Sequence, residues 1–440
     1  MRSRVRRQHV AILSTLLFCL SAIQAHAATI TVTNTNDSGP GSLRQALADA
    51  NDGDTINFAV TGRIALTSGG LGIDKSLTIS GPGVHQLSID GNQGQGGGCI
   101  FYAHYNTVTI SGLTITNGGC GIASDHGALS VSNCVVTANN GYGYDSVGIA
   151  INNAQGPTVP GEREDLGDAR EGCGAGVVTL TVANCIISDN SGPGVWNLSA
   201  GVTITDSTIS GNSNGYGGGG GIYTDGTKLP GNLTVINSTI SGNFAFDNGG
   251  GISSGFSGLT IINSTISGNS TGDPDYGYGG GVAARGVTIS NSTINGNSAG
   301  SGGGIYNALG YYGGTIEISN TILNAGAVGE NIVNNGGTVI SHGYNISSDD
   351  GGGYLTGLGD QINTDPLLSP LRNHGGPTLT HLPLRGSPAI DAGDPGFTPP
   401  PDHDQRGPCF YRVFGGRIDV GSVETQLRPR CVTPAPRPTP

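Results

Sequence analysis

Aliphatic and polar residues alternate in short stretches along most of the chain, and the alternation breaks at the same kind of residue each time. The phrase N-S-T-I-S-G-N occupies 237–243 and 263–269, and it recurs with one change at 291–297. Aliphatic residues stand four and two positions before its first Asn, and another stands three positions after it. A period of two predicts half-buried β-strands. Each copy therefore predicts two short strands joined at a corner.

The corner falls on residue types that readily enter the left-handed α conformation. When ten copies are aligned on the first Asn of the phrase, this position holds only Gly, Asn or Asp. We interpret it as a forced backbone bend that resets which face of the chain points inward. The aligned glycines are Gly81, Gly112 and Gly343. The predicted bends that carry a side chain are Asn133, Asn184, Asp206, Asn237, Asn263, Asn291 and Asn320.

Successive bends are about 21 to 31 residues apart, apart from one interval of about 51 residues. Such a period with tolerated insertions is typical of a solenoid, in which each coil packs only on its neighbours. We therefore predict an all-β fold, a parallel β-solenoid of about ten coils. A β-sandwich is the structural alternative because it also uses short alternating strands, but it does not require the same bend residue in every repeat.

Composition divides the chain around the repeats, which cover 61–345. An arginine-rich start, an apolar run and Ala25-His26-Ala27 predict a secretory signal peptide over 1–27. Residues 28–60 are expected to form a cap of one strand and one short helix, with Ser42 as its N-cap and Gln45 completing a capping box. The other predicted segments are a polar insertion at 152–172, a C-terminal module at 346–426 and a proline-rich tail at 427–440.

Several stretches resemble bacterial protein families. The segment S-L-R-Q-A that begins at Ser42 resembles the S-L-R-E-A segment of CSLREA proteins, with Gly41 where that family has cysteine. The I-x-x-N and G-G-G-I steps of the coils resemble the repeats of polymorphic outer membrane proteins. The overall pattern resembles right-handed parallel β-helices of the pectate-lyase-like superfamily. The D-Q-R-G at 404–407 and the I-D-V-G at 418–421 resemble the choice-of-anchor Q module.

Together these resemblances imply a right-handed parallel β-helix in an exported bacterial protein. They leave the activity open, because these families share a coil geometry that serves many functions.

The charge balance excludes some partners. Removal of residues 1–27 takes away four arginines and no acidic residue, so the formal charge goes from −12 to about −16. This charge argues against nucleic acid and anionic membranes as partners, and it would repel a polyanionic polysaccharide unless a cation bridged the two. The mature chain has no apolar stretch long enough for a membrane span. We expect a secreted or cell-surface protein.

Seven of the eight cysteines remain after cleavage of the predicted signal peptide. Export permits disulfides, and the odd number leaves at least one thiol without an internal partner. The pairing stays open, with Cys409 and Cys431 favoured because both lie outside the repeats. The cysteines show no zinc-ligand spacing.

The coils are poor in residues that could carry catalysis. A pectate lyase of the resembled fold would need calcium-binding carboxylates beside an arginine, and a polygalacturonase would need paired aspartates. Only eight charged side chains occur between residues 201 and 324. We therefore predict no catalytic residue and no cofactor, with calcium as the candidate cation at Asp349 and Asp350. Arg406 is expected to clamp Asp391 or Asp394.

Two features could bind a ligand at a surface. Tyrosines recur in the loops beside the glycine steps, where their rings could stack on sugars or simply cover a bare glycine edge. Thr and Ser two and four residues past the bend, such as Thr265 and Ser267, are expected to form a flat outward hydroxyl face that resembles T-x-T ice-binding arrays. Trp196 supports no prediction. The tyrosine candidates are Tyr216, Tyr223, Tyr276, Tyr278, Tyr306 and Tyr311.

The leading functional hypothesis is an exported, non-catalytic β-solenoid for surface contact, adhesion or polysaccharide binding. Its partner would be a polysaccharide or another cell-surface molecule. The alternative is a polysaccharide lyase or glycoside hydrolase of the pectate-lyase-like fold.

Overall fold

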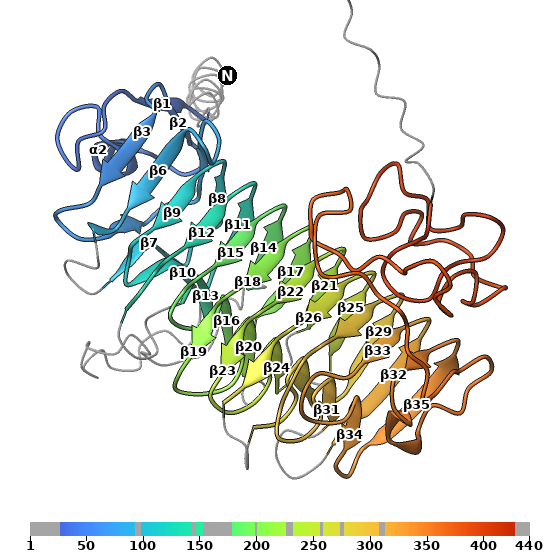
Figure 1. The fold of residues 1–440 in the computed structure, drawn as a ribbon. Helices are drawn as coiled ribbons and strands as arrows, with labels where there is room; N and C mark the ends of the chain where they lie inside the picture. Colours follow the sequence, from blue (N-terminus) through green and yellow to red (C-terminus); the bar gives the residue numbers. More distant parts are fainter. Residues whose placement is uncertain are drawn as a thin grey trace, which may run out of the picture.

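Three long parallel sheets run the length of the molecule, and a coil contributes one strand to each (Figure 1). We call them sheets A, B and C, in the order in which the chain passes through a coil. Residues 1–26, 153–177 and 427–440, which hold the predicted signal peptide, most of the polar insertion and the tail, lie outside the described ranges. The computed structural model describes residues 27–92, 98–141, 147–152, 178–198, 200–225, 232–255, 258–272, 277–307 and 313–426.

The strands follow one another in the same order in each coil. Sheet A consists of β1 (Thr29–Val32), β2 (Thr55–Phe58), β5 (Leu77–Ser80), β8 (Val108–Ser111), β11 (Ala128–Ser132), β14 (Thr179–Ala183), β17 (Gly201–Thr205), β21 (Leu233–Ile236), β25 (Leu259–Ile262), β29 (Val287–Ser290), β32 (Thr315–Ser319) and β35 (Thr338–Gly343). Sheet B consists of β3 (Gly62–Ala65), β6 (Leu87–Asp90), β9 (Thr114–Thr116), β12 (Val135–Thr137), β15 (Ile186–Ser188), β18 (Thr208–Ser210), β22 (Thr239–Ser241), β26 (Thr265–Ser267), β30 (Thr293–Asn295), β33 (Ile322–Asn324) and β36 (Ile346–Ser347). Sheet C consists of β4 (Leu71–Ile73), β7 (Cys99–His104), β10 (Cys120–Asp125), β13 (Ile149–Asn152), β16 (Val195–Leu198), β20 (Ile222–Asp225), β24 (Ile252–Ser254), β28 (Val282–Ala284), β31 (Ile305–Asn307) and β34 (Ile332–Asn334). A small fourth sheet joins β19 (Ser213–Asn214), β23 (Phe244–Ala245) and β27 (Ser270–Thr271).

The core is a stack of aliphatic side chains along the rod. Ile240 pairs with Ile266, and Ile266 pairs with Ile294, so equal residues lie one above another. All three are fully buried. Removal of this apolar surface from water drives folding. The predicted parallel β-solenoid of about ten coils is thereby confirmed.

The corner between sheets A and B has the left-handed backbone that the sequence suggested. The seven aligned Asn and Asp residues have φ between 48° and 52°. Gly81 does not adopt a positive φ. At the far end the corner falls on Tyr344, at φ 57°, because a bulge after Ile318 shifts the register of β35. Some corner amides also bond to one another, as where Asn263 Nδ2 donates to Asn237 Oδ1 at 2.7 Å.

Asn263→Val is expected to lower the free energy of unfolding by roughly 3 kcal/mol. The left-handed backbone strains a β-branched residue by about 1–2 kcal/mol, and the two bonds from the Asn263 amide, to Asn237 and to the carbonyl of His403, are lost. Urea unfolding measures the change. Asn263→Gly is the control because it loses the bonds without the strain, so equal stability of the valine variant and the wild type would contradict the corner assignment.

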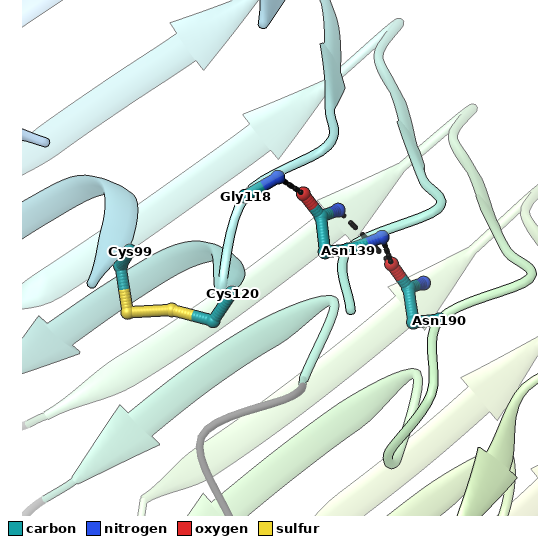
Figure 2. Close-up of a disulfide and its surroundings, with 5 residues drawn as sticks. All are labelled: Cys99, Gly118, Cys120, Asn139 and Asn190. Atoms are coloured by element: carbon teal, nitrogen blue, oxygen red, sulfur yellow. Dashed lines mark hydrogen bonds between the residues drawn. A yellow bond between two sulfur atoms is a disulfide. The ribbon is translucent and has the colours of Figure 1, made fainter. Parts of the chain in front are cut away.

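A second asparagine ladder, which the sequence interpretation missed, lies fully buried where the chain leaves sheet B. Each of its Asn residues before the last gives its backbone N–H and its side-chain amide to the Oδ1 of the next Asn, as Asn139 does to Asn190 at 3.1 and 3.0 Å (Figure 2). The other amide hydrogen bonds a carbonyl of the preceding coil, as from Asn269 to Ile240 at 2.9 Å. The members are Asn139, Asn190, Asn212, Asn243, Asn269 and Asn297.

The backbone of the next coil, together with this ladder, explains the glycine steps that precede sheet C. A Cβ at Gly251 would lie 2.5 Å from the carbonyl oxygen of Gly281 and 3.1 Å from the Asn269 amide. Real Cβ atoms do not come that close to backbone, so the position requires glycine.

One helix, α2 (Leu43–Asp49), covers the N-terminal end of the rod; a 3₁₀ turn, η3 (Gly351–Gly353), follows the last strand. Ser42 caps α2 by accepting the N–H of Gln45 at 3.2 Å. The Gln45 side chain bonds Asp49 rather than Ser42, so the predicted capping box is only half formed. Strands β1 and β2, expected within a cap, are the first two strands of sheet A. No helix in the described ranges is long and apolar enough to cross a membrane.

One pair of cysteines links neighbouring coils through a disulfide, and another pair is buried as free thiols. Cys99 on β7 and Cys120 on β10 are register partners and form a disulfide (Figure 2). Cys134 and Cys185, each next to a corner Asn, are buried free thiols in successive described coils. Cys409 is disulfide-bonded, and its expected partner Cys431 lies outside the described residues.

Candidate functional site

The hydroxyl face expected on sheet B is covered by the chain's own C-terminal segment. This segment, red in Figure 1, lies against the yellow and orange coils. Thr265 Oγ1 donates to Gln405 Oε1 at 2.6 Å, and Ser267 Oγ lies 2.8 Å from His381 Nε2. Both sheet residues are buried. The hydroxyl ladder of β22, β26 and β30 therefore docks the C-terminal segment, and the expectation of a free face over these strands is wrong.

The C-terminal segment has a buried ionic cluster of its own. Arg406 pairs with Asp404 at 2.6 Å and donates to the carbonyl of Glu424 at 2.6 Å. The expected partners of Arg406 were Asp391 or Asp394, and that prediction is wrong. Asp404 takes the role because it lies two residues away in the same tight turn, where its carboxylate also accepts the N–H of Arg406 at 2.8 Å.

The calcium candidates make structural hydrogen bonds. Asp349 accepts the N–H of Asn331 and the hydroxyl of Ser347 at 2.8 and 2.7 Å, and Asp350 caps η3 through the N–H of Gly352 at 2.9 Å. Burial alone would raise the pKa of Asp349, but these hydrogen bonds outweigh it and the pKa is lowered. Among the described residues no three His, Cys, Asp or Glu side chains are grouped as metal ligands.

A line of aromatic and small side chains follows the outer face of sheet C, and we call it the sheet C column. Strand alternation places its members outward, because the residues beside them, such as Val195, Asn197 and Ile222, are fully buried. Register pairs join one member to the next from β7 to β31. The members are Tyr102, Ala123, Ala150, Trp196, Tyr223, Ser253, Ala283 and Tyr306.

The rings of the column are placed symmetrically about a central pair. Trp196 and Tyr223 are direct neighbours. Tyr102 lies three strands before Trp196, and Tyr306 lies three strands after Tyr223. Strands are about 4.8 Å apart, so each of these gaps is about 14 Å. Ala123 and Ala150 are half-buried and leave a shallow step between Tyr102 and Trp196. Ser253, Ala283 and Tyr306 are buried, so the accessible part of the column runs from Tyr102 to Tyr223.

Some of the predicted tyrosines belong to this column or contact it, and others do not. Tyr223 and Tyr306 belong to it, and Tyr278 stacks on Tyr306 with ring centroids 4.6 Å apart. Tyr216 is 66% exposed and lies in the turn after β19. Tyr276 and Tyr311 lie outside the described residues.

Sequence interpretation missed two rings of the column, Trp196 and Tyr102. An alignment on the glycine step would have found Trp196, because G-V-W, G-I-Y and G-I-Y place Trp196, Tyr223 and Tyr306 at the same position. Tyr102 has no such glycine step before it, and only the pairing of β7 with β10 places it in the column.

The model of the right-handed beta helix region matches residues 79–266 and 148–310. These matches together span more than half of the chain, which therefore belongs to the right-handed β-helix family. No curated protein sequence matches it significantly.

Among solved structures, the chain is similar to pectate lyase Pel9A, at 14% identity over 91% of this chain and 97% of that chain, with a TM-score of 0.53. It also matches the A-module of mannuronan C-5 epimerase AlgE4 from Azotobacter vinelandii, at 12% identity over 75% of this chain and 95% of that chain, with a TM-score of 0.46. At 14% identity, the similarity to pectate lyase Pel9A shows a shared fold and nothing about function.

Proposed function

We propose that this chain is an exported, non-catalytic β-helix that binds an extended neutral polysaccharide along the outer face of sheet C. The observation that carries the proposal is the sheet C column, with Trp196 and Tyr223 at its centre. Aromatic rings stack on the C–H faces of sugars and leave the hydroxyl groups free to bond with neighbouring polar groups. The two central rings, Trp196 and Tyr223, lie one strand spacing apart, which suits neighbouring sugars of a ribbon-like β-linked chain, whose repeat has a similar length.

Charge favours a neutral ligand over a polyanion. Residues 28–440 carry a formal charge of about −16. On the face itself, Asp125 and Asp225 alternate with buried residues of β10 and β20 and so point outward. A polyuronate would be repelled by this field. The resemblances of Ser42–Phe58 and of 346–426 to segments of exported solenoids support a location at the cell surface or outside the cell.

Trp196 provides a direct test because it is the only tryptophan in the chain. Titration with neutral β-1,4-linked hexasaccharides of glucose, xylose or mannose is expected to change its fluorescence. Calorimetry on Trp196→Ala is expected to show at least tenfold weaker binding, equivalent to about 1.4 kcal/mol, because the central platform is lost.

Tyr411→Ala is the control for Trp196→Ala, since Tyr411 is an exposed ring in the C-terminal segment. Equal loss in both variants, or no binding by the wild type, would contradict the proposal. Release of reducing sugar from a polysaccharide would show that the protein is a glycoside hydrolase, and release of an unsaturated product would show that it is a polysaccharide lyase; either result would replace the proposal.

A further inference from the structure

A group of aromatic and imidazole rings stands beside the N-terminal end of the sheet C column. The rings of Tyr105 and His126 are stacked, with centroids 4.8 Å apart and planes 17° apart. The ring of His104 meets Tyr105 edge to face at 4.2 Å. Tyr105 and His126 occupy the same corner of two successive coils, directly after β7 and β10, and the N–H of Tyr105 donates to the carbonyl of Asp125 at 2.8 Å.

Both corner residues have a left-handed backbone, which is an outlier for a bulky residue such as Tyr105. Tyr105 has φ 56° and His126 has φ 55°. The chain fills most of its other side-chain-bearing left-handed positions with Asn or Asp, the residues that tolerate this conformation best. An Asn at the Tyr105 corner would serve the fold equally well or better. The outlier at Tyr105 supports a use for its ring, because the ring is also exposed.

Polar groups converge next to the rings. Tyr102 Oη donates to Asp125 Oδ2 at 2.9 Å, and His104 Nδ1 lies 4.0 Å from the same oxygen. The His104 side chain is 47% exposed and that of Asp125 is 19% exposed. Tyr105 is 49% exposed, and the buried Nδ1 of His126 has no hydrogen-bond partner. Exposed rings beside a carboxylate and an imidazole combine the two contacts that a sugar needs, a face for its C–H groups and partners for its hydroxyls.

We propose that Tyr102, His104, Tyr105, Asp125 and His126 form a subsite for one neutral pyranose. The sugar packs against the exposed part of the Tyr105 ring, beside the stacked His126, and its hydroxyls bond to Asp125 and His104. This inference rests on the proposed function and adds to it a defined sugar position. Tyr105 lies three residues past Tyr102, about 10 Å to the side of the column. The bound sugar is therefore one that leaves the line of the main chain, either a chain end or a branch.

The strain at Tyr105 makes a clean test available. Tyr105→Asn removes the ring and supplies a residue that suits the left-handed backbone, so its unfolding midpoint is expected to equal or exceed that of the wild type. Its affinity for a branched galactomannan oligosaccharide or a linear mannohexaose is expected to fall about tenfold. A loss with the branched ligand alone identifies a branch, and a loss with both identifies a chain end. Lower stability with unchanged affinity would show a structural role and overturn the subsite.

Tyr411→Asn is the matched control, because Tyr411 has the same 49% exposure and also pairs with a histidine ring, His403, at 5.3 Å. Trp196 fluorescence separates this inference from the proposed function. If Trp196 responds to ligand and Tyr105→Asn binds like the wild type, the subsite fails and the sheet C proposal stands. If ligand shifts the ring signals of His126 in ¹³C-histidine NMR spectra and leaves Trp196 unchanged, the column fails and the subsite stands. A ligand that affects neither overturns both.

Discussion

Asn269→Ala is expected to lower the free energy of unfolding by about 4 kcal/mol. The Oδ1 atom of Asn269 accepts the backbone N–H and the side-chain amide of Asn243, at 3.0 and 2.9 Å. Its Nδ2 donates to the carbonyl of Ile240 and to Asn297 Oδ1, both at 2.9 Å. The residue is fully buried, so no water replaces these partners. A buried polar group left unsatisfied costs about 1–3 kcal/mol, and this variant creates more than one.

Asn324→Ala is the control for this prediction. Asn324 also stacks on an asparagine of the neighbouring coil, but its amide makes a single 2.7 Å bond to Asn295 at a half-buried position. Its loss is expected to cost about 1 kcal/mol. Urea unfolding of both variants at one pH measures the difference. Equal losses would show that the inner ladder contributes no more than an ordinary surface hydrogen bond.

The fold could be predicted because its determinants are local. A period of two fixes which residues of a strand point inward, and a left-handed corner at Asn237 or Asn263 needs only the residue type at that position. The inner ladder escaped prediction although its Asn recurs in every copy of the phrase. Its role depends on the distance between coils, because Asn269 bonds Asn297 across 28 residues of sequence.

The surface was harder to predict because its neighbours are distant in sequence. The hydroxyl of Thr265 bonds Gln405, which is 140 residues away. No periodicity within the coils indicates that the C-terminal segment folds back on them. The ring group around Tyr105 likewise needs the pairing of β7 with β10. Trp196 alone could have been found from a local pattern, the glycine step that precedes it. The repeats were aligned on the corner residue instead, and the loop between the corner and the glycine step varies in length, so the shared position of Trp196, Tyr223 and Tyr306 did not line up.

The ionic cluster of the C-terminal segment is unbalanced unless it holds a proton. Arg406 and Arg412 supply two positive charges, and three carboxyl groups, those of Asp404, Asp419 and Glu424, lie buried with them. Burial raises the pKa of Glu424 to about 8, and the nearby Asp419 carboxylate adds to the increase. Burial raises the pKa of Asp419 as well. A protonated Glu424 leaves two charges of each sign, which is the arrangement that burial favours.

Glu424→Gln is therefore expected to gain stability over the wild type as the pH rises. The pKa of Glu424 is 4.5 ordinarily and about 8 in the folded chain. The stabilisation that its proton provides is fully present below pH 4.5 and is lost as the pH rises through 8. Each pKa unit corresponds to about 1.4 kcal/mol, so the stability of the variant relative to the wild type should increase by roughly 4 kcal/mol between pH 5 and pH 9. Comparing the two chains at each pH cancels the opposite contribution of His374 and His381, whose pKa values burial lowers.

Urea unfolding of wild type and Glu424→Gln at several pH values measures this gain. Glu317→Gln is the control for removal of a carboxylate, because the Glu317 side chain is 45% exposed and lies on sheet A, away from the cluster. If the difference in free energy of unfolding between Glu424→Gln and wild type stays constant from pH 5 to pH 9, Glu424 is not the group that holds the proton. A pH-dependent loss of stability that persists in Glu424→Gln would assign the proton to Asp419, which lies in the same buried site, where its N–H donates to Glu424 Oε2 at 3.0 Å.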